Sequence, residues 1–130
     1  MRNIYIIEKS HFVNNNLYLS LNEKQNRIQI QPAGQMLADS DNVAFIYVVE
    51  EEASYSYLKI PQDYWSYLVP LLNTQTNPIL LINDQEIELI NFTDELTMLL
   101  LNIEGNDNYG NFFVETVERE FSAFYKKQNE

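Results

Sequence analysis

The sequence predicts an α+β domain in which an antiparallel sheet of about five to seven strands is covered on one side by about three helices. Short segments of alternating apolar and polar residues, separated by Asn-rich turns, fill the first part of the chain. Apolar residues at helical spacing dominate its last part. Because strands come first and helices last, with no alternating strand–helix pattern, a doubly wound nucleotide-binding sheet is disfavoured.

The N-terminal part predicts three strands. The first begins at residues 4–7 and continues toward Val13, and the second is the alternating segment 17–21. Asn-rich turns at 14–16 and 22–26 bound the second strand, since Asn tolerates positive φ. A third half-buried strand covers 28–31, where Ile alternates with polar residues.

A central hairpin is the clearest prediction. Residues 43–49 form an apolar run rich in β-branched residues, which indicates a strand in the middle of a sheet. Three glutamates end that strand at 50–52, and a second strand follows over 54–60. Its alternation places Tyr55, Tyr57 and Lys59 on one face and Ser56, Leu58 and Ile60 on the other.

Helices and a second hairpin follow. Pro61 suits the first turn of a helix over 64–72, and Pro70 must kink that helix or end it near Tyr67. Residues 79–82 and 86–90 read as paired strands. The remaining helices are expected from Asn91 or Thr93 to Ile103, with Gly105 as the C-terminal cap, and from Val114 to about Lys127.

Length and composition limit the possibilities. With 130 residues the chain is expected to form a single domain over residues 1–130. Cysteine is absent, which excludes thiolate zinc sites, iron–sulfur clusters, thiol catalysis and disulfides. The longest uncharged stretch, 64–83, is interrupted by Pro70 and Pro78, so no membrane span is expected. The short apolar N-terminus does not fit a signal peptide, and we expect a cytoplasmic protein.

The charge is strongly acidic and unevenly distributed. Asp and Glu number 19 against 8 Lys and Arg, which gives a formal charge of -11. Between Ile28 and Glu118 the single base is Lys59, and 15 acids give that span 1 − 15 = −14. It should repel nucleic acid and anionic membranes, whose binding depends on Lys and Arg. A basic or amphipathic protein partner would be attracted, although negative charge also serves solubility alone.

Two segments contain candidate ligands. In segment 32–42, Asp39 and Asp41 flank Ser40 and could bind a hard cation, or they could cap a turn. The loop 104–110 partly matches a calcium loop, with Asn106 and Asn108 at ligand spacing, but Tyr109 stands where a glycine is needed. A tight turn between two helices explains this loop more simply.

Catalytic chemistry has little support. His11 is the single histidine, and no hydroxyl lies in a Gly-x-Ser-x-Gly setting. We therefore expect no catalytic residue and no cofactor. Exposed tyrosines could instead form a recognition surface. The candidate binding surface consists of Gly34, Gln35, Asp39, Asp41, Tyr55, Tyr57, Asn106, Asn108 and Tyr109.

Two strings, PAGQMLADSDN at 32–42 and NIEGNDNYG at 102–110, resemble a small family of Firmicutes, uncharacterised protein family 0738. The similarity includes Trp65, the NDQEIEL stretch and segment 113–118, and it covers about residues 34–118. It implies a bacterial cytosolic protein and carries over no activity, cofactor or catalytic residue.

Two functions follow as hypotheses. The first is a non-enzymatic interaction or regulatory module whose acidic span and tyrosine face meet a basic or amphipathic protein. The second is a small-ligand or divalent-metal-binding protein, or a hydrolase, that uses Asp39, Asp41 and the loop 104–110. The sequence does not place segments 32–42 and 104–110 relative to each other, and a twofold dimer is compatible with either hypothesis.

Overall fold

The computed structural model describes residues 3–21 and 28–130, and the turn expected at 22–26 lies outside these ranges. The strands are β1 (Ile4–Val13), β2 (Asn16–Leu21), β3 (Ile30–Asp39), β4 (Ala44–Glu51), β5 (Ser54–Pro61), β6 (Ile79–Ile82) and β7 (Gln85–Glu88). The helices are α1 (Trp65–Thr74), α2 (Phe92–Ile103), α3 (Asn111–Glu120) and α4 (Ser122–Gln128), with 3-10 turns η1 (Gln62–Tyr64) and η2 (Asp107–Tyr109). This is the α+β class predicted from the sequence.

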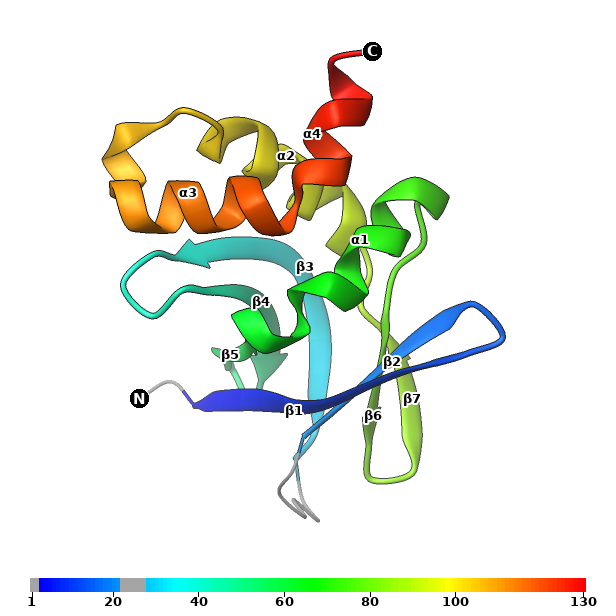
Figure 1. The fold of residues 1–130 in the computed structure, drawn as a ribbon. Coiled ribbons are helices and arrows are strands. Elements are labelled where there is room, and N and C mark those ends of the chain that lie inside the picture. Colours follow the sequence, from blue (N-terminus) through cyan, green and yellow to red (C-terminus); the bar gives the residue numbers. More distant parts are fainter. Residues whose placement is uncertain (1–2, 22–27) are drawn as a thin grey trace.

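The strands form one sheet in the order β3-β4-β5-β1-β2-β6-β7. Hairpin partners pair antiparallel, whereas β1 pairs with β5 and β2 with β6 in parallel. The sheet is therefore mixed rather than purely antiparallel. The reason is that the N-terminal hairpin is inserted between two later groups of strands, so its outer edges meet non-local neighbours (Figure 1).

The sheet curls strongly, which brings its two edge strands toward each other. The Asn83 side chain in the β6–β7 turn donates to the carbonyl of Ile28, just before β3, at 3.0 Å. Farther along the same edge, the Met36 amide donates to Glu95 on α2 at 3.1 Å. Backbone groups that an open edge strand would leave unpaired thus obtain partners.

The core lies between the inner face of this sheet and the helices, which cover it on one side (Figure 1). Its centre is aromatic: the Trp65 ring lies 4.9 Å from Phe45 and 5.7 Å from Phe121, centroid to centroid. The apolar residues spaced along α2, α3 and α4 are buried as their spacing predicted. The C-terminal helix is divided at Phe121, and α4 continues with Phe124 and Tyr125 in the core.

Two elements differ from what the local sequence indicates. Segment 32–42 does not look like a strand in the sequence, yet most of it belongs to β3, with a bulge between Pro32 and Gln35. Pairing with the strongly apolar β4 outweighs the weak strand propensity of this segment. Helix α1 does not end near Tyr67, one of the two outcomes expected from Pro70, but continues to Thr74 with Pro70 on its exposed side. Water can solvate there the carbonyl that Pro70 leaves without an amide donor.

Candidate functional site

The sheet face turned away from the helices carries several exposed or half-buried apolar side chains. Registered pairing places Leu37, Ile46, Lys59 and Ile6 in one row across β3, β4, β5 and β1, and Gln35, Val48, Tyr57 and Ile4 in the next row. We call these eight residues the open face. Ile4 is 60% exposed and Ile6 44% exposed, far more than isoleucines of a core.

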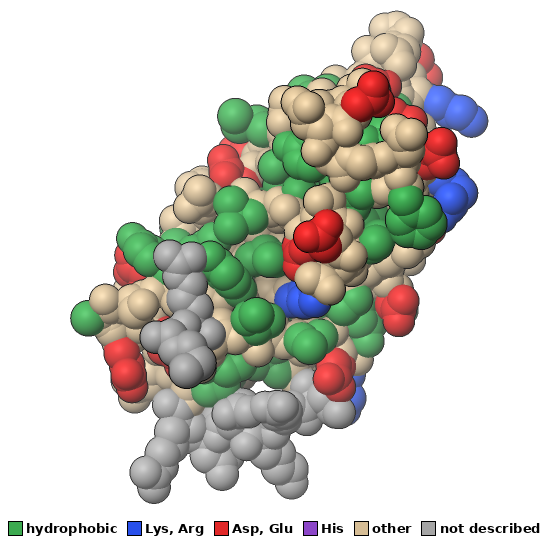
Figure 2. All heavy atoms as spheres, turned by 90° about the vertical axis from the view of Figure 1, so that its left-hand side faces the viewer, with side chains coloured by type: hydrophobic (Ala, Val, Ile, Leu, Met, Phe, Trp, Pro, Cys, Tyr) green, Lys and Arg blue, Asp and Glu red, His purple; other side chains and the backbone are tan. Residues whose placement is uncertain are grey.

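Lys59 lies within this apolar surface. It is half-buried, and no ion pair joins it to another described residue. Figure 2 turns the left-hand side of Figure 1 toward the viewer and shows hydrophobic side chains near its middle, beside one basic side chain and a neighbouring acidic one. The open face thus combines apolar area with a single positive charge.

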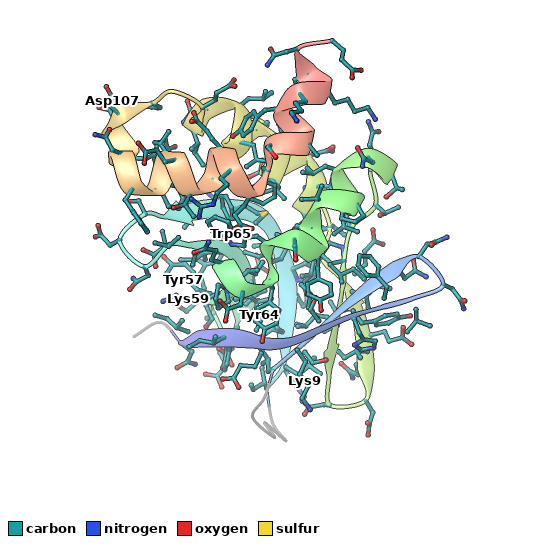
Figure 3. The ribbon with its side chains drawn as sticks, viewed as in Figure 1. Lys9, Tyr57, Lys59, Tyr64, Trp65 and Asp107 are labelled. Carbon is teal, nitrogen blue, oxygen red and sulfur yellow. The ribbon has the colours of Figure 1, made fainter. Side chains whose placement is uncertain are left out.

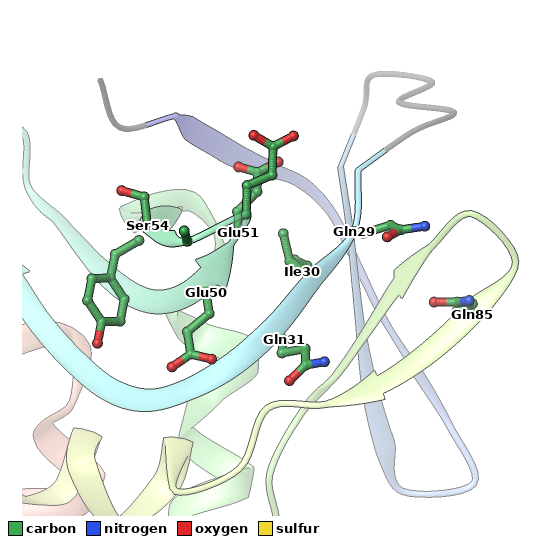
Figure 4. A pocket seen from close by; sticks show the side chains of 10 residues that line it. Gln29, Ile30, Gln31, Glu50, Glu51, Ser54 and Gln85 are labelled. Atoms are coloured by element: carbon green, nitrogen blue, oxygen red, sulfur yellow. The ribbon is translucent and has the colours of Figure 1, made fainter.

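A cleft of about 670 Å³ adjoins the open face at the β4–β5 turn. We call it the acidic cleft, because it includes three consecutive glutamates and no described Lys, Arg or His (Figure 4). Its lining consists of Gln29, Ile30, Gln31, Glu50, Glu51, Glu52, Ala53, Ser54, Tyr55 and Gln85. Three sheet segments that are distant in sequence form it: the start of β3, the β4–β5 turn and the start of β7.

Glu51 is the most enclosed carboxylate of the cleft and the best connected. It accepts hydrogen bonds from Tyr5 Oη at 2.7 and 2.9 Å, from Ser56 Oγ at 2.7 Å and from Asn3 Nδ2 at 3.0 Å. Burial raises the pKa of Glu51, but donation by Asn3, Ser56 and Tyr5 outweighs it, and the net pKa is lowered. Burial and the Glu51 charge raise the pKa of Tyr5 to about 12. The cleft therefore holds this carboxylate ionised near neutral pH.

Replacing Tyr5 by Phe should lower the free energy of unfolding at neutral pH without changing the shape of the core. The lowered pKa of Glu51 stabilises the fold above the ordinary value of 4.5, and this contribution is lost as pH falls through the folded pKa. Without the Tyr5 hydroxyl the downward pKa shift of Glu51 shrinks, so Tyr5→Phe should lose stability at neutral pH and little at an acidic pH well below the folded pKa of Glu51. Urea unfolding at both pH values measures this difference.

The matched control is Tyr55→Phe, which removes an exposed hydroxyl with no hydrogen bond to a described residue. It should leave the unfolding midpoint unchanged at both pH values. Equal losses of stability for Tyr5→Phe at neutral and acid pH would contradict the assigned role of Glu51.

The carboxylates predicted as metal ligands serve the β3–β4 turn. Asp39 accepts from the Asn42 amide at 3.3 Å and from Asn42 Nδ2 at 2.9 Å, and Asp41 is exposed in the same turn. The described ranges contain no group of three or more His, Cys, Asp or Glu side chains that could hold a metal ion.

The loop 104–110 is organised by its own amides. The Asn106 side chain accepts from the Asn108 amide at 3.1 Å and donates to the carbonyl of Asn102 at 3.0 Å. Asn102 also donates to Tyr109 Oη at 2.7 Å, and the Gly105 amide donates to Glu118 at 2.9 Å. No hydrogen bond between described residues joins this loop to the β3–β4 turn, and Asp107 lies far from Lys59 in Figure 3.

The remaining candidates divide between two surfaces. Tyr55 lines the acidic cleft, while Gln35 and Tyr57 belong to the open face, as the alternation of β5 predicted. Gly34 lies in the β3 bulge against Asn91. Gln29, Gln31 and Gln85 were not predicted as site residues, because only the curl of the sheet brings them beside the glutamates.

The comparisons with known proteins identify relatives without a described activity. The model of a family of unknown function, UPF0738, matches residues 5–121. A UPF0738 protein of Lysinibacillus sphaericus is 53% identical, covering 95% of this chain and 97% of its own. Relatives from Staphylococcus aureus (46% identical; 71% and 76% covered) and Bacillus mycoides (39%; 72% and 76%) carry the same family name. No solved structure matches the chain significantly.

A search of the described residues for a helix long and apolar enough to cross a membrane finds none.

Proposed function

The chain belongs to the UPF0738 family, and we propose that it is a protein-interaction module whose acidic cleft binds a basic segment of a partner protein. The observation that carries this proposal is the lining of the cleft. Carboxylates, side-chain amides and one exposed tyrosine ring line it, and they come from three parts of the sheet (Figure 4).

These groups match the chemistry of an arginine or lysine side chain. Glu50 and Glu52 offer charged acceptors for a guanidinium or ammonium group, and the amide oxygens of the glutamines offer neutral acceptors. The ring of Tyr55, which is exposed at the rim, can stack on a guanidinium plane. The negative span of the chain would also accelerate the approach of a basic partner.

Binding suits the cleft better than proton transfer does. A general acid or base works best when its pKa lies near the operating pH. The pKa of Glu51 is displaced downward, away from neutrality, by three side-chain donors. A carboxylate fixed in its charged form serves as a permanent partner for a cation, which supports a recognition role for this site.

Charge reversal at Glu52 tests the proposal. We expect Glu52→Lys to weaken binding of a fluorescent peptide of alternating Arg and Leu residues by at least about fivefold at low salt. Glu52 is exposed in the β4–β5 turn, so the variant should keep the unfolding midpoint of the wild type. Fluorescence anisotropy titrations at low and high salt measure the affinity, and added salt should weaken the wild-type interaction.

Glu115→Lys is the matched control, because it makes the same change in net charge at an exposed position of α3 outside the cleft. Its affinity should stay close to that of the wild type. If both variants lose the same affinity, the peptide senses only the net charge of the protein and the cleft is not its site.

A further inference from the structure

The open face and its border carry one positive and one negative side chain on the same side of the sheet. Lys59 is the positive group of the face, and Glu50 lies on the same side of the sheet, at its border with the acidic cleft. The cross-strand partner of Glu50 is Tyr55, four residues before Lys59 on β5. At about 3.3 Å per residue, the two charges are separated by about 13 Å along the strands.

The row between these charges is apolar or neutral. Tyr57 and Ile4 lie side by side there, next to Val48, which is only 5% exposed, and Gln35 lies at the β3 end of the row. Two copies can place their open faces together around a twofold axis that runs along this row, across the strands. The strands of one copy then run in the opposite direction to the same strands of the other. Each Lys59 then lies opposite the end of the second copy that carries Glu50, and the apolar rows meet each other.

From this pattern we propose that the open face is the contact surface of a twofold dimer in which Lys59 of one copy pairs with Glu50 of the other. Isologous dimers require a self-complementary patch, and this face supplies one. Burial of Ile4 and Ile6, together with the half-exposed Leu37 and Ile46, provides the hydrophobic stabilisation. The Lys59 stem adds apolar contact, while its ammonium group gains an ionic partner that none of the described residues of its own chain supplies.

A second copy fits this face better than the basic partner proposed for the cleft. A strongly basic segment would place further positive charge against Lys59, which costs free energy in apolar surroundings. The second copy instead offers a carboxylate at the right position. Each chain is acidic overall, with a formal charge of -11. The affinity of the dimer should therefore rise as salt screens the repulsion between the two chains. This proposal shares Glu50 with the function proposed for the cleft, so the two are separated by Lys59→Glu, outside the cleft lining, and by Glu52→Lys, outside the open face.

A charge swap distinguishes a second copy from every other partner. We expect the wild type to sediment as a dimer at about 100 µM. Lys59→Glu alone and Glu50→Lys alone should each sediment as monomers, because each single variant creates like-charge contacts on both sides of the axis. The double variant Lys59→Glu/Glu50→Lys restores both pairs with opposite polarity and should sediment as a dimer again.

Controls separate loss of the interface from loss of the fold. Both side chains are outside the core, so circular dichroism and unfolding midpoints of the single variants should match the wild type. Glu115→Lys changes net charge as Glu50→Lys does and should leave the dimer intact. Ile4→Asp, at an exposed apolar position of the face, should also yield a folded monomer.

A monomeric wild type at that concentration overturns the proposal, and so does a double variant that remains monomeric while its fold is intact. Lys59→Glu leaves every residue of the cleft lining unchanged. Its loss of the dimer is therefore measured independently of peptide binding at Glu52, and either proposal can fail without the other.

Discussion

Replacing Trp65 by Ala should lower the free energy of unfolding by about 3–5 kcal/mol, the largest effect that we expect from a single substitution. Trp65 has no exposed surface, and its ring packs on Phe45, Phe113 and Phe121 with centroid distances of 4.9 to 6.2 Å. Its Nε1 also donates to the carbonyl of Ile60 at 3.1 Å. The substitution leaves a cavity at the centre of this cluster and removes the Nε1 donor from the Ile60 carbonyl.

Urea unfolding monitored by circular dichroism measures the loss. Small domains typically have a free energy of unfolding of about 5–15 kcal/mol. If the wild type lies near the lower value, a substantial fraction of Trp65→Ala should be unfolded in water. Phe112→Ala is the control: it also truncates an aromatic residue, but one that is 70% exposed on α3, and it should cost less than about 0.5 kcal/mol. A loss below about 1 kcal/mol for Trp65→Ala would mean that this cluster is not the centre of the core.

Gly34→Ala should lower the free energy of unfolding by about 2–3 kcal/mol, through backbone strain and a steric clash. Gly34 has a φ of +76°, in the left-handed region, and a Cβ placed there would lie 2.8 Å from Asn91 Nδ2. The Asn91 backbone is held before α2, with a φ of 62° and a carbonyl that accepts from the Glu95 amide at 2.9 Å, so relief of the clash requires the Asn91 side chain to rotate away. Thermal and urea unfolding measure the effect.

Two variants divide this loss into its parts. Gly105→Ala has a similar φ of +65° with no heavy atom within 4 Å of the added Cβ, so it should show the strain alone, about 1–2 kcal/mol. The double variant Gly34→Ala/Asn91→Ala removes the clashing side chain and should recover the difference. Equal losses for Gly34→Ala and Gly105→Ala would show that the Asn91 side chain yields without cost.

Local patterns were sufficient for most elements of this fold. Alternation along β2 and β5 assigned the buried faces correctly, because successive side chains of a strand point to opposite faces and the buried face is therefore apolar at every second residue. Helical spacing likewise identified Leu96, Leu100 and Ile103 as core residues. These predictions needed no information about the rest of the chain.

The pairing of strands and the position of β3 depended on non-local contacts. Nothing in the first strand indicates that it pairs with β5 in parallel, since either direction would bury the same alternating face. Segment 32–42 is poor in strand formers and contains a proline and a glycine. It becomes a strand because β4 supplies hydrogen bonds and an apolar surface along its length.

The candidate site shows the same division. Tyr55 and Tyr57 could be placed on the solvent-facing side of their strand from alternation alone, and they border the two surfaces described above. The glutamate run at 50–52 was interpreted as the end of a strand, which it also is. That Gln85 lines the same cleft follows from the contact of Asn83 with Ile28, which no local pattern records.

The insertion of the N-terminal hairpin between β5 and β6 has a consequence for the order of folding. During synthesis β1 and β2 leave the ribosome first and can pair with each other at once, but both flanking strands are made much later. Both edges of the hairpin therefore stay unpaired until β5 and β6 have been made. The parallel pairings with β5 and β6 also close the longest loops among the strand pairings, so they have the largest loop-closure cost. We expect these pairings to form last, so the earliest part of the chain to be made is the last to be secured.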